Sequence, residues 1–179
     1  MNTTAKVFLS ILLFLLTGVL AAGFSGYPYW NTVPFVSPVS YKGELPIRSD
    51  GYGSGVFGSR RSGGRKHRGI DLAGEVGAPV YAVRSGRIKK ADYHRGYGNF
   101  IIIDHGRGQE SRYAHLKEKE VRRGQRVRQG KKIGIIGKTG NARRRAILPH
   151  LHFEWVDHGN PQDPTELVRQ AKVKTENGK

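Results

Sequence analysis

From Gly51 onward, short runs of apolar and β-branched residues alternate with turns that contain glycine. The runs PVYAVR (79–84), NFIIIDH (99–105) and ESRYAHL (110–116) show this pattern most clearly. Runs that recur about every 8–12 residues with such turns between them are typical of antiparallel strands. One helix is predicted, over PTELVRQAK (164–172). The chain is therefore expected to be mainly β, with an antiparallel sheet and few short helices.

The N-terminus has the layout of a secretory signal peptide. One lysine precedes an apolar run from Val7 to about Leu20, and the small residues Ala21 and Ala22 follow. A membrane span needs about 20 apolar residues, so the run is short for one, although the residues that follow extend it enough to keep an uncleaved anchor as the alternative. Residues 1–22 are expected to be a signal peptide, or an N-terminal membrane anchor, that directs export to the periplasm, the cell wall or the extracellular space.

The rest of the chain divides into three segments by composition. Residues 23–50 hold four of the eight prolines and several aromatic residues, and they are predicted to form an irregular lead-in that is not a domain itself. Residues 51–168 carry the predicted strands and form the candidate functional domain. Residues 169–179 are expected to be a basic C-terminal tail.

Charge and cysteine content narrow the classes of partner. The chain has 31 Lys and Arg against 14 Asp and Glu, a net charge of +17. Such a balance indicates an anionic partner, which is nucleic acid, anionic lipid or an acidic polymer of the cell envelope, and a solvated surface without a partner is the alternative. Export argues against nucleic acid and favours an anionic wall or envelope polymer. The chain has no cysteine, so the exported fold depends on its core or on a metal held by other ligands.

The stretch ILPHLHFEWV (147–156) places two histidines two residues apart in a predicted strand. Side chains two apart on a strand lie on the same face, so His150 and His152 project together while Leu151 and Phe153 point into the core. Two imidazoles on one face can share a metal, or act as one ligand and one base. A pair of surface histidines is the simpler alternative.

Two further motifs offer ligands or bases. His67 and Asp71 are four apart in KHRGIDLAG, where the glycines favour an extended backbone over a helix. In SRYAHL, His115 is expected to share a strand face with Tyr113, and taken alone it would be a structural or surface residue. His67, Asp71 and one histidine of the HxH pair make three protein ligands, the number typical of a catalytic zinc site with one open position.

In order and spacing, these motifs resemble the lysostaphin/LytM-type zinc metallopeptidases, which cut peptides in bacterial peptidoglycan. The resemblance covers roughly residues 55–167, from FGSR through HRGIDLAG, SRYAHL and GKTG to PHLHFE. It implies an antiparallel sheet that forms the floor of a narrow groove walled by loops, and it makes 51–168 the zinc metallopeptidase domain. It also implies zinc as the cofactor, with His67, Asp71 and His152 as metal ligands and His115 and His150 as catalytic residues beside the water.

The function implied by the resemblance is that of an exported zinc-dependent endopeptidase. It would hydrolyse peptide bonds in peptidoglycan cross-links or stem peptides through a zinc-activated water, with peptidoglycan peptides as partners and a membrane contact only if the N-terminal segment stays uncleaved. The alternative is a non-catalytic LytM-type regulator of a cell-wall amidase, since some relatives have lost their ligands. All five site positions are present in this chain.

One loop departs from the family pattern, and several residues stay open as candidates. ARRRAIL (142–148) is longer than the usual link and holds three consecutive arginines, which are expected to engage acidic stem peptides or anionic wall polymers, or to be solvated. Asp104 and Glu154 are the candidates that would orient the zinc ligands. Asn31, Glu44 and Asp50 are the lead-in residues that would reach the open zinc position if the lead-in covers the groove. No catalytic role is expected for the remaining histidines, His94, His105 and His158.

Overall fold

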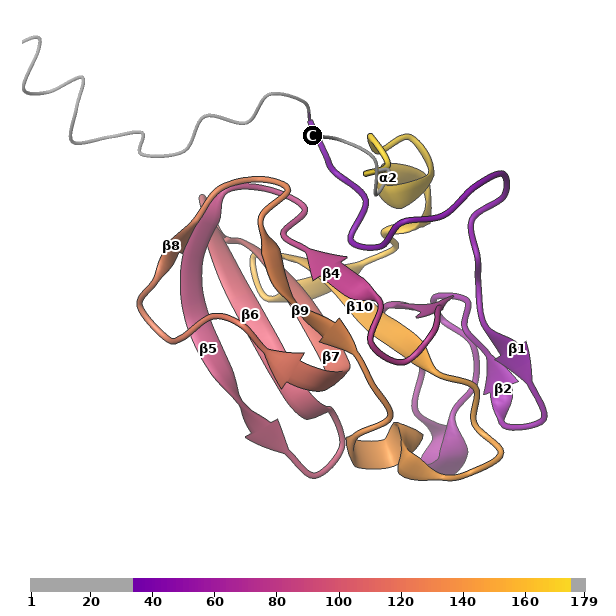
Figure 1. Cartoon of the computed structure of the whole chain (residues 1–179). Coiled ribbons are helices and arrows are strands. Elements are labelled where there is room, and N and C mark those ends of the chain that lie inside the picture. The colour runs from indigo at the N-terminus through magenta and orange to yellow at the C-terminus, as the bar shows by residue number, and fades with distance from the viewer. Residues whose placement is uncertain (1–33, 175–179) are drawn as a thin grey trace, which may run out of the picture. The chain divides into compact units, whose positions relative to one another are not determined.

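An antiparallel sheet of nine strands carries the fold (Figure 1). The structure, a computed structural model, describes residues 34–174, all within one compact unit of the chain, Asn31–Lys179. The predicted signal peptide or anchor, the start of the lead-in and the last five residues of the tail lie outside the described residues. Among residues 34–174, no helix has the length and apolar character needed to span a membrane.

The strands of the sheet follow the order β11-β10-β7-β6-β5-β8, with β3 paired to β10 and with β9 paired to β7 and β4. Every strand pair is antiparallel, which confirms the predicted fold class. A separate two-stranded sheet joins β1 to β2. The bounds are β1 Ser49–Asp50, β2 Gly53–Ser54, β3 Ile70–Ala73, β4 Pro79–Tyr81, β5 Gly86–His94, β6 Gly98–Gly106, β7 Gln109–Lys119, β8 Arg126–Val127, β9 Lys132–Ile136, β10 His150–Asp157 and β11 Asn160–Gln162.

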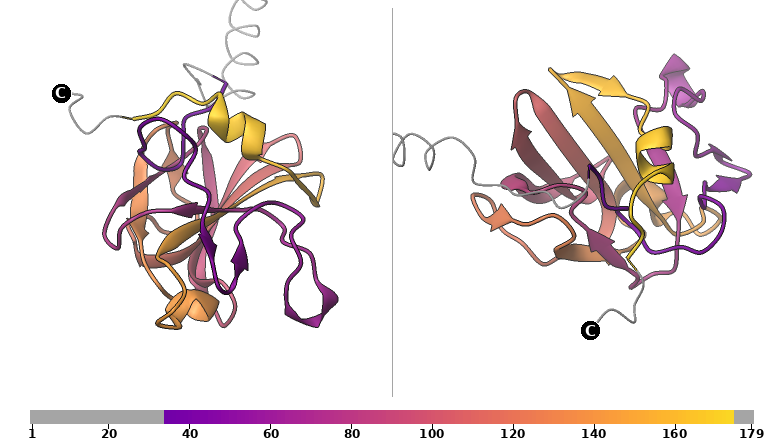
Figure 2. Two further views of the ribbon diagram at one scale, coloured as in Figure 1. Left: turned by 90° about the vertical axis from the view of Figure 1, so that its right-hand side faces the viewer. Right: turned by 90° about the horizontal axis from the view of Figure 1, so that it is seen from above.

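Within the described residues, 34–174, helices are few and short. Two 3₁₀ turns, η1 (Ser62–Gly64) and η2 (Gly140–Arg143), lie in loops, and the α-helix α2 (Thr165–Arg169) follows the last strand. The helix begins after Pro164, as the sequence predicts, but it ends earlier than residue 172. In Figure 1 and in the left view of Figure 2, α2 lies at the opposite end of the sheet from η2.

The apolar core lies on one face of the long strands. Leu151 and Phe153 of β10 are fully buried in it, as the alternation of the HxH stretch predicts, together with Tyr113 of β7. Seven of the eight residues of β10 are buried, because its other face also carries enclosed side chains. Those side chains, with the loops that contain η1 and η2, position the candidate site.

The lead-in and the tail are both joined to the core over the part that the structure describes. Phe35 packs edge-on against Trp155 of β10, with ring centroids 5.1 Å apart. The amide of Lys172 donates to the carbonyl of Phe35 at 3.2 Å, and Ala171 is buried. The residues on either side of the predicted domain therefore contribute to its core. The lead-in makes only isolated bridges and short pairings there, such as Ile47 with Leu72 of β3.

Candidate active site

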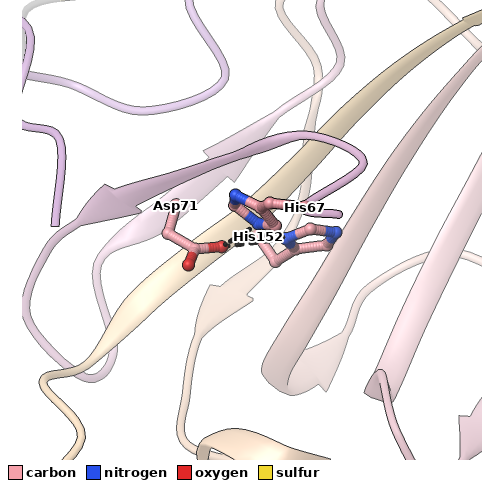
Figure 3. Close-up of side chains that lie close together, drawn as sticks. All are labelled: His67, Asp71 and His152. Carbon is pink, nitrogen blue, oxygen red and sulfur yellow. Dashed lines mark hydrogen bonds and ion pairs between the residues drawn. The ribbon is translucent and has the colours of Figure 1, made fainter. Parts of the chain in front are cut away.

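Strand register brings Asp71 and His152 together. In the β3–β10 pair these two residues are direct Cα partners, and side chains at paired positions of neighbouring strands lie on the same face. Oδ1 of Asp71 lies 2.8 Å from Nδ1 of His152. His67, in the loop just before β3, is held by hydrogen bonds between its backbone and those of Gly58 and Ser59. Figure 3 shows the three side chains pointing toward one another from the two strands and the loop.

One atom of each of these side chains forms a triangle that fits a metal ion. Nε2 of His67 lies 3.0 Å from both Nδ1 of His152 and Oδ1 of Asp71. All three side chains are buried. Tetrahedral zinc with bonds near 2.0–2.1 Å places its ligands about 3.3 Å apart, so a small outward shift accommodates the ion. The donor set and its geometry make this a His–Asp–His zinc site, with the same three residues that the sequence predicts.

Hydrogen bonds on the far side of each imidazole leave the inward nitrogen free for a metal. Nδ1 of His67 donates to the carbonyl of Val56 at 2.9 Å, so Nε2 keeps its lone pair. Nε2 of His152 lies 3.0 Å from Oε1 of Glu154, which leaves Nδ1 as the ligand atom. Partners of this kind set the tautomer and the ring orientation of metal-binding histidines.

Asp71 is held as a carboxylate by its surroundings. Burial alone would raise its pKa, but the hydrogen bond from His152 and the positive charge of that imidazole bring the pKa of Asp71 well below its usual range. Its outer oxygen, Oδ2, accepts hydrogen bonds from Arg48 and Arg61, each at 3.0 Å. The inner oxygen, Oδ1, therefore faces the two histidines with the charge that a cation requires.

Glu154 connects the zinc site to a buried polar network. Tyr97 donates to Oε1 of Glu154 at 2.6 Å, and Arg112 pairs with Oε2 at 3.2 Å. Burial would raise the pKa of Glu154, but the hydrogen bond with His152 lowers it to about 2. The sequence named Glu154 and Asp104 as candidates to orient a ligand; the structure places Glu154 there, while Asp104 is exposed and accepts a hydrogen bond from the amide of Gly106.

Without a metal, His152 holds a proton between two carboxylates. Burial lowers its pKa, but hydrogen bonds with Asp71 and Glu154 outweigh burial and raise the pKa to about 9. A cation at the triangle competes with this proton, so metal binding at neutral pH is expected to release it.

Two more imidazoles lie beside the triangle. The rings of His115 and His150 are 5.0 Å apart, and the ring of His115 lies 5.9 Å from that of His152. Nδ1 of His115 donates to the carbonyl of Thr139 at 2.9 Å, and Nδ1 of His150 donates to that of Leu148 at 2.7 Å. In each ring the second nitrogen, Nε2, is therefore the one available to a reacting group.

Both of these imidazoles are neutral near pH 7. Burial, followed by the nearby His152 and His150, lowers the pKa of His115 to about 3. Burial also lowers the pKa of His150, against the attraction of Asp71. A neutral imidazole whose Nδ1 donates to a carbonyl presents an acceptor at Nε2, so both side chains can take up a proton.

The backbone at His115 breaks the strand alternation, and one prediction is wrong for this reason. Alternation would place Tyr113 and His115 on one face, but His115 has a φ of 63° in the left-handed region. Tyr113 instead lies in the core against Phe153, and its hydroxyl accepts from the amide of Val83 at 3.0 Å. The unusual φ is what allows His115 to face the zinc site rather than the core.

The other candidates lie elsewhere. His105 lies between the carbonyl of Ser85 and the hydroxyl of Ser111, at 2.8 Å from each. The exposed His94 accepts from the amide of Gly96, and the exposed His158 contacts Asp157. Of the lead-in candidates, Asp50 is held by Arg48 and by the amide of Leu148, Glu44 lines a separate cavity with Tyr41 and Arg169, and Asn31 lies outside the described residues.

Comparison with known proteins identifies relatives of this chain. Residues 65–164 match the model of Peptidase family M23. The peptidoglycan DD-endopeptidase ShyC of Vibrio cholerae is 37% identical over 112 residues, which are 62% of this chain and 25% of that protein. The chain thus spans about a quarter of the length of this curated relative.

Two solved structures share the fold. A zinc-containing peptidase from Vibrio cholerae has 31% sequence identity and a TM-score of 0.59, over 78% of this chain and 41% of that one. The catalytic domain of lysostaphin from Staphylococcus simulans has 34% identity and a TM-score of 0.55, over 68% of this chain and 92% of that one.

Proposed function

The chain belongs to peptidase family M23, and we propose that it is an exported zinc endopeptidase that hydrolyses peptide bonds in bacterial peptidoglycan, in cross-links or in stem peptides. One observation carries this proposal: the buried triangle of His67, Asp71 and His152 has two neutral imidazoles beside it. The name of the relative ShyC, a peptidoglycan DD-endopeptidase, supports the substrate class.

The metal and the two imidazoles divide the chemistry. Zinc held by Nε2 of His67, Oδ1 of Asp71 and Nδ1 of His152 supplies Lewis-acid chemistry, which polarises a peptide carbonyl and lowers the pKa of water. His115 and His150 each offer Nε2 as a proton acceptor to the attacking water. The imidazole that takes the proton becomes a donor at Nε2, and it can then stabilise the developing oxyanion or protonate the leaving amine.

Burial gives the pair its driving force for returning the proton. Because the pKa of His115 is lowered to about 3, its imidazolium form gives a proton up readily, while its neutral form is a weak proton acceptor near pH 7. The backbone carbonyls of Thr139 and Leu148 fix both rings, so neither needs to reorient between accepting and donating.

The setting of the enzyme is part of the proposal. Residues 1–22 direct export to the periplasm, the wall or the exterior, and they keep the protein at a membrane only if they remain uncleaved. The basic surface, from a net charge of +17, attracts anionic wall or envelope polymers rather than nucleic acid. A non-catalytic regulator of an amidase has no need of the complete set of three ligands and two imidazoles, so the site favours the enzyme.

Digestion of purified peptidoglycan by the zinc-loaded chain, with products identified by mass spectrometry, tests the proposal. We expect release of uncross-linked peptides that stops when a chelator is added and resumes with zinc. The His150→Ala variant should be inactive, and the matched His158→Ala variant, which changes an exposed histidine, should be as active as the wild type. A chain that binds one zinc ion and cleaves nothing would instead support the regulator.

A further inference from the structure

The loop from Lys138 to Pro149 is anchored at both ends on the two imidazoles beside the zinc triangle. Near its start, the carbonyl of Thr139 accepts the hydrogen bond from His115, and near its end the carbonyl of Leu148 accepts the one from His150. The loop contains η2 and lies with it at one end of the sheet (Figure 1). The residues in the middle of this loop, 143–145, are at most four residues along the chain from Thr139 or Leu148, so they lie within about 14 Å of one of these two anchors.

The middle of the loop carries Arg143, Arg144 and Arg145, all exposed. Among residues 34–174, no ion pair involves any of the three. The chain has no Asp or Glu between Glu120 and Glu154, so the sequence around the loop supplies no local carboxylate. The positive charge of these arginines is left for a ligand from outside.

The carboxylates in and around the zinc site are already paired with other arginines. Oδ2 of Asp71 is bound by Arg48 and Arg61, and Glu154 is bound by Arg112 and His152. Asp50, which accepts the amide of Leu148 at the end of the loop, is paired with Arg48. The charges inside the site are thus matched to one another, and the arginine triplet remains as a separate cationic element at its edge.

We propose that Arg143, Arg144 and Arg145 bind free carboxylates of the substrate peptide, so that the enzyme prefers carboxylated peptides to the same peptides with carboxamides. This inference rests on the proposed peptidase function. The planar guanidinium group presents paired N–H donors that match a carboxylate and that a carboxamide cannot satisfy in the same way. The three arginines thereby distinguish charged from neutral side chains next to the scissile bond.

The position of the triplet favours a substrate peptide over a long wall polymer as its ligand. At physiological ionic strength the screening length is about 8 Å, so exposed arginines act mainly on groups that come close to them. A polymer would spread over a surface with 31 basic residues in the chain, and three of these would matter little. A peptide held for cleavage brings its carboxylates to this loop in particular.

The test uses two synthetic cross-linked peptide dimers of identical sequence, with the residues that flank the scissile bond in free carboxylate or in carboxamide form. The zinc-loaded full chain should cleave the carboxylate dimer with the lower KM. The triple variant R143Q/R144Q/R145Q should raise KM for that dimer about tenfold, because each exposed ion pair contributes a factor of a few at most. Its kcat, and its KM for the carboxamide dimer, should stay within about twofold of wild type.

A matched control removes the same charge far from the site. The variant R122Q/R123Q/R126Q changes three exposed arginines near β8, which pairs with the start of β5. The loop from Lys138 to Pro149 contacts the chain beyond the other end of β5, where the amide of Asn141 donates to the carbonyl of Gly96. This control should keep the preference for the carboxylate dimer, and equal losses in the two triple variants would overturn the inference in favour of general charge attraction.

Two outcomes separate this inference from the proposed function. Equal cleavage of the two dimers by the wild type would overturn the inference and leave the peptidase intact, whereas cleavage of neither would count against the peptidase. Fluorescence anisotropy with labelled, uncross-linked peptides in the two forms then tests the arginines without catalysis. Binding that does not differ between carboxylate and carboxamide would overturn the inference whatever the activity.

Discussion

Nε2 of His152 lies 3.0 Å from Oε1 of Glu154, two residues further along β10. Because alternate residues of a strand share a face, one strand supplies a zinc ligand and the carboxylate that orients it, and it also supplies the catalytic candidate His150. Through Glu154 the ligand is connected to Tyr97 in the β5–β6 turn and to Arg112 on β7. The orientation of His152 therefore depends on strands β10 and β7 and on the β5–β6 turn.

Removal of this charge should weaken zinc binding while the fold is kept. In Glu154→Gln the amide oxygen still accepts from His152, but the negative charge that makes the imidazole a better ligand is gone. Loss of such a partner typically lowers metal affinity about 10- to 100-fold, and we expect the lower end of that range. Competition with a chromophoric zinc chelator measures the affinity. The control Glu120→Gln changes a surface ion pair with Lys132 and should bind zinc as the wild type does; equal affinities for both variants would contradict the role of Glu154.

The Asp71→Asn substitution should destabilise the protein even when no metal is present. Arg48 is buried, and it donates to Oδ2 of Asp71, so the neutral side chain leaves part of a buried cation uncompensated. Breaking a buried ion pair by removing one partner costs roughly 3 kcal/mol or more. Urea unfolding in the presence of chelator measures this cost apart from the loss of zinc. His67→Ala, which also removes a ligand but leaves no charge unpaired, should cost less; an Asp71→Asn variant as stable as the wild type in chelator would show that Arg48 is satisfied by Asp50 alone.

Short sequence motifs predicted the parts of the site that depend on the spacing of residues along the chain. The HxH motif predicted that His150 and His152 share a face, because residues two apart on a strand point the same way. The HxxxD motif named His67 and Asp71 as ligand candidates, although His67 lies in the loop before β3, and the resemblance supplied the role of His152 as ligand. The antiparallel sheet followed from the recurring apolar runs and glycine turns. The same reasoning failed at His115, since a single positive φ reverses the direction of a side chain and nothing in SRYAHL announces it.

Contacts between distant segments could not be predicted in this way. Arg48 lies 23 residues before Asp71, and it reaches the carboxylate because the lead-in runs beside β3, where Ile47 bridges to Leu72. Tyr97 reaches Glu154 across 57 residues for a similar reason. Such pairs depend on register and on loop paths, and one sequence contains no periodic signal for either.

Stability should fall in mild acid because of His105. Burial, more than the charge of Arg84, lowers the pKa of His105 to about 4, against about 6.5 for an unfolded chain. Between these values the unfolded chain binds a proton that the folded chain does not, so stability is lost as the pH falls from about 6.5 toward 4. This amounts to about 2 kcal/mol between pH 7 and pH 5. Urea unfolding measures the free energy of unfolding at pH 7 and at pH 5. The loss of this free energy between the two pH values should be about 2 kcal/mol smaller in His105→Asn than in the wild type. An equal loss in both proteins would contradict the role of His105.

Substitution of His115 should abolish activity and leave the zinc site occupied. His115 is buried beside the triangle, but it is not one of the three residues whose atoms form it. Loss of a proton-transfer group lowers the rate by about 10²- to 10⁴-fold. His115→Asn is the better variant, since asparagine tolerates the φ of 63° more readily than alanine and keeps the backbone near its present path. Zinc content by atomic emission, together with muropeptide release, separates the two effects: one zinc ion per chain without activity is expected. A variant that loses both would make His115 a residue that maintains the metal site, and the proton transfer would then be left to His150.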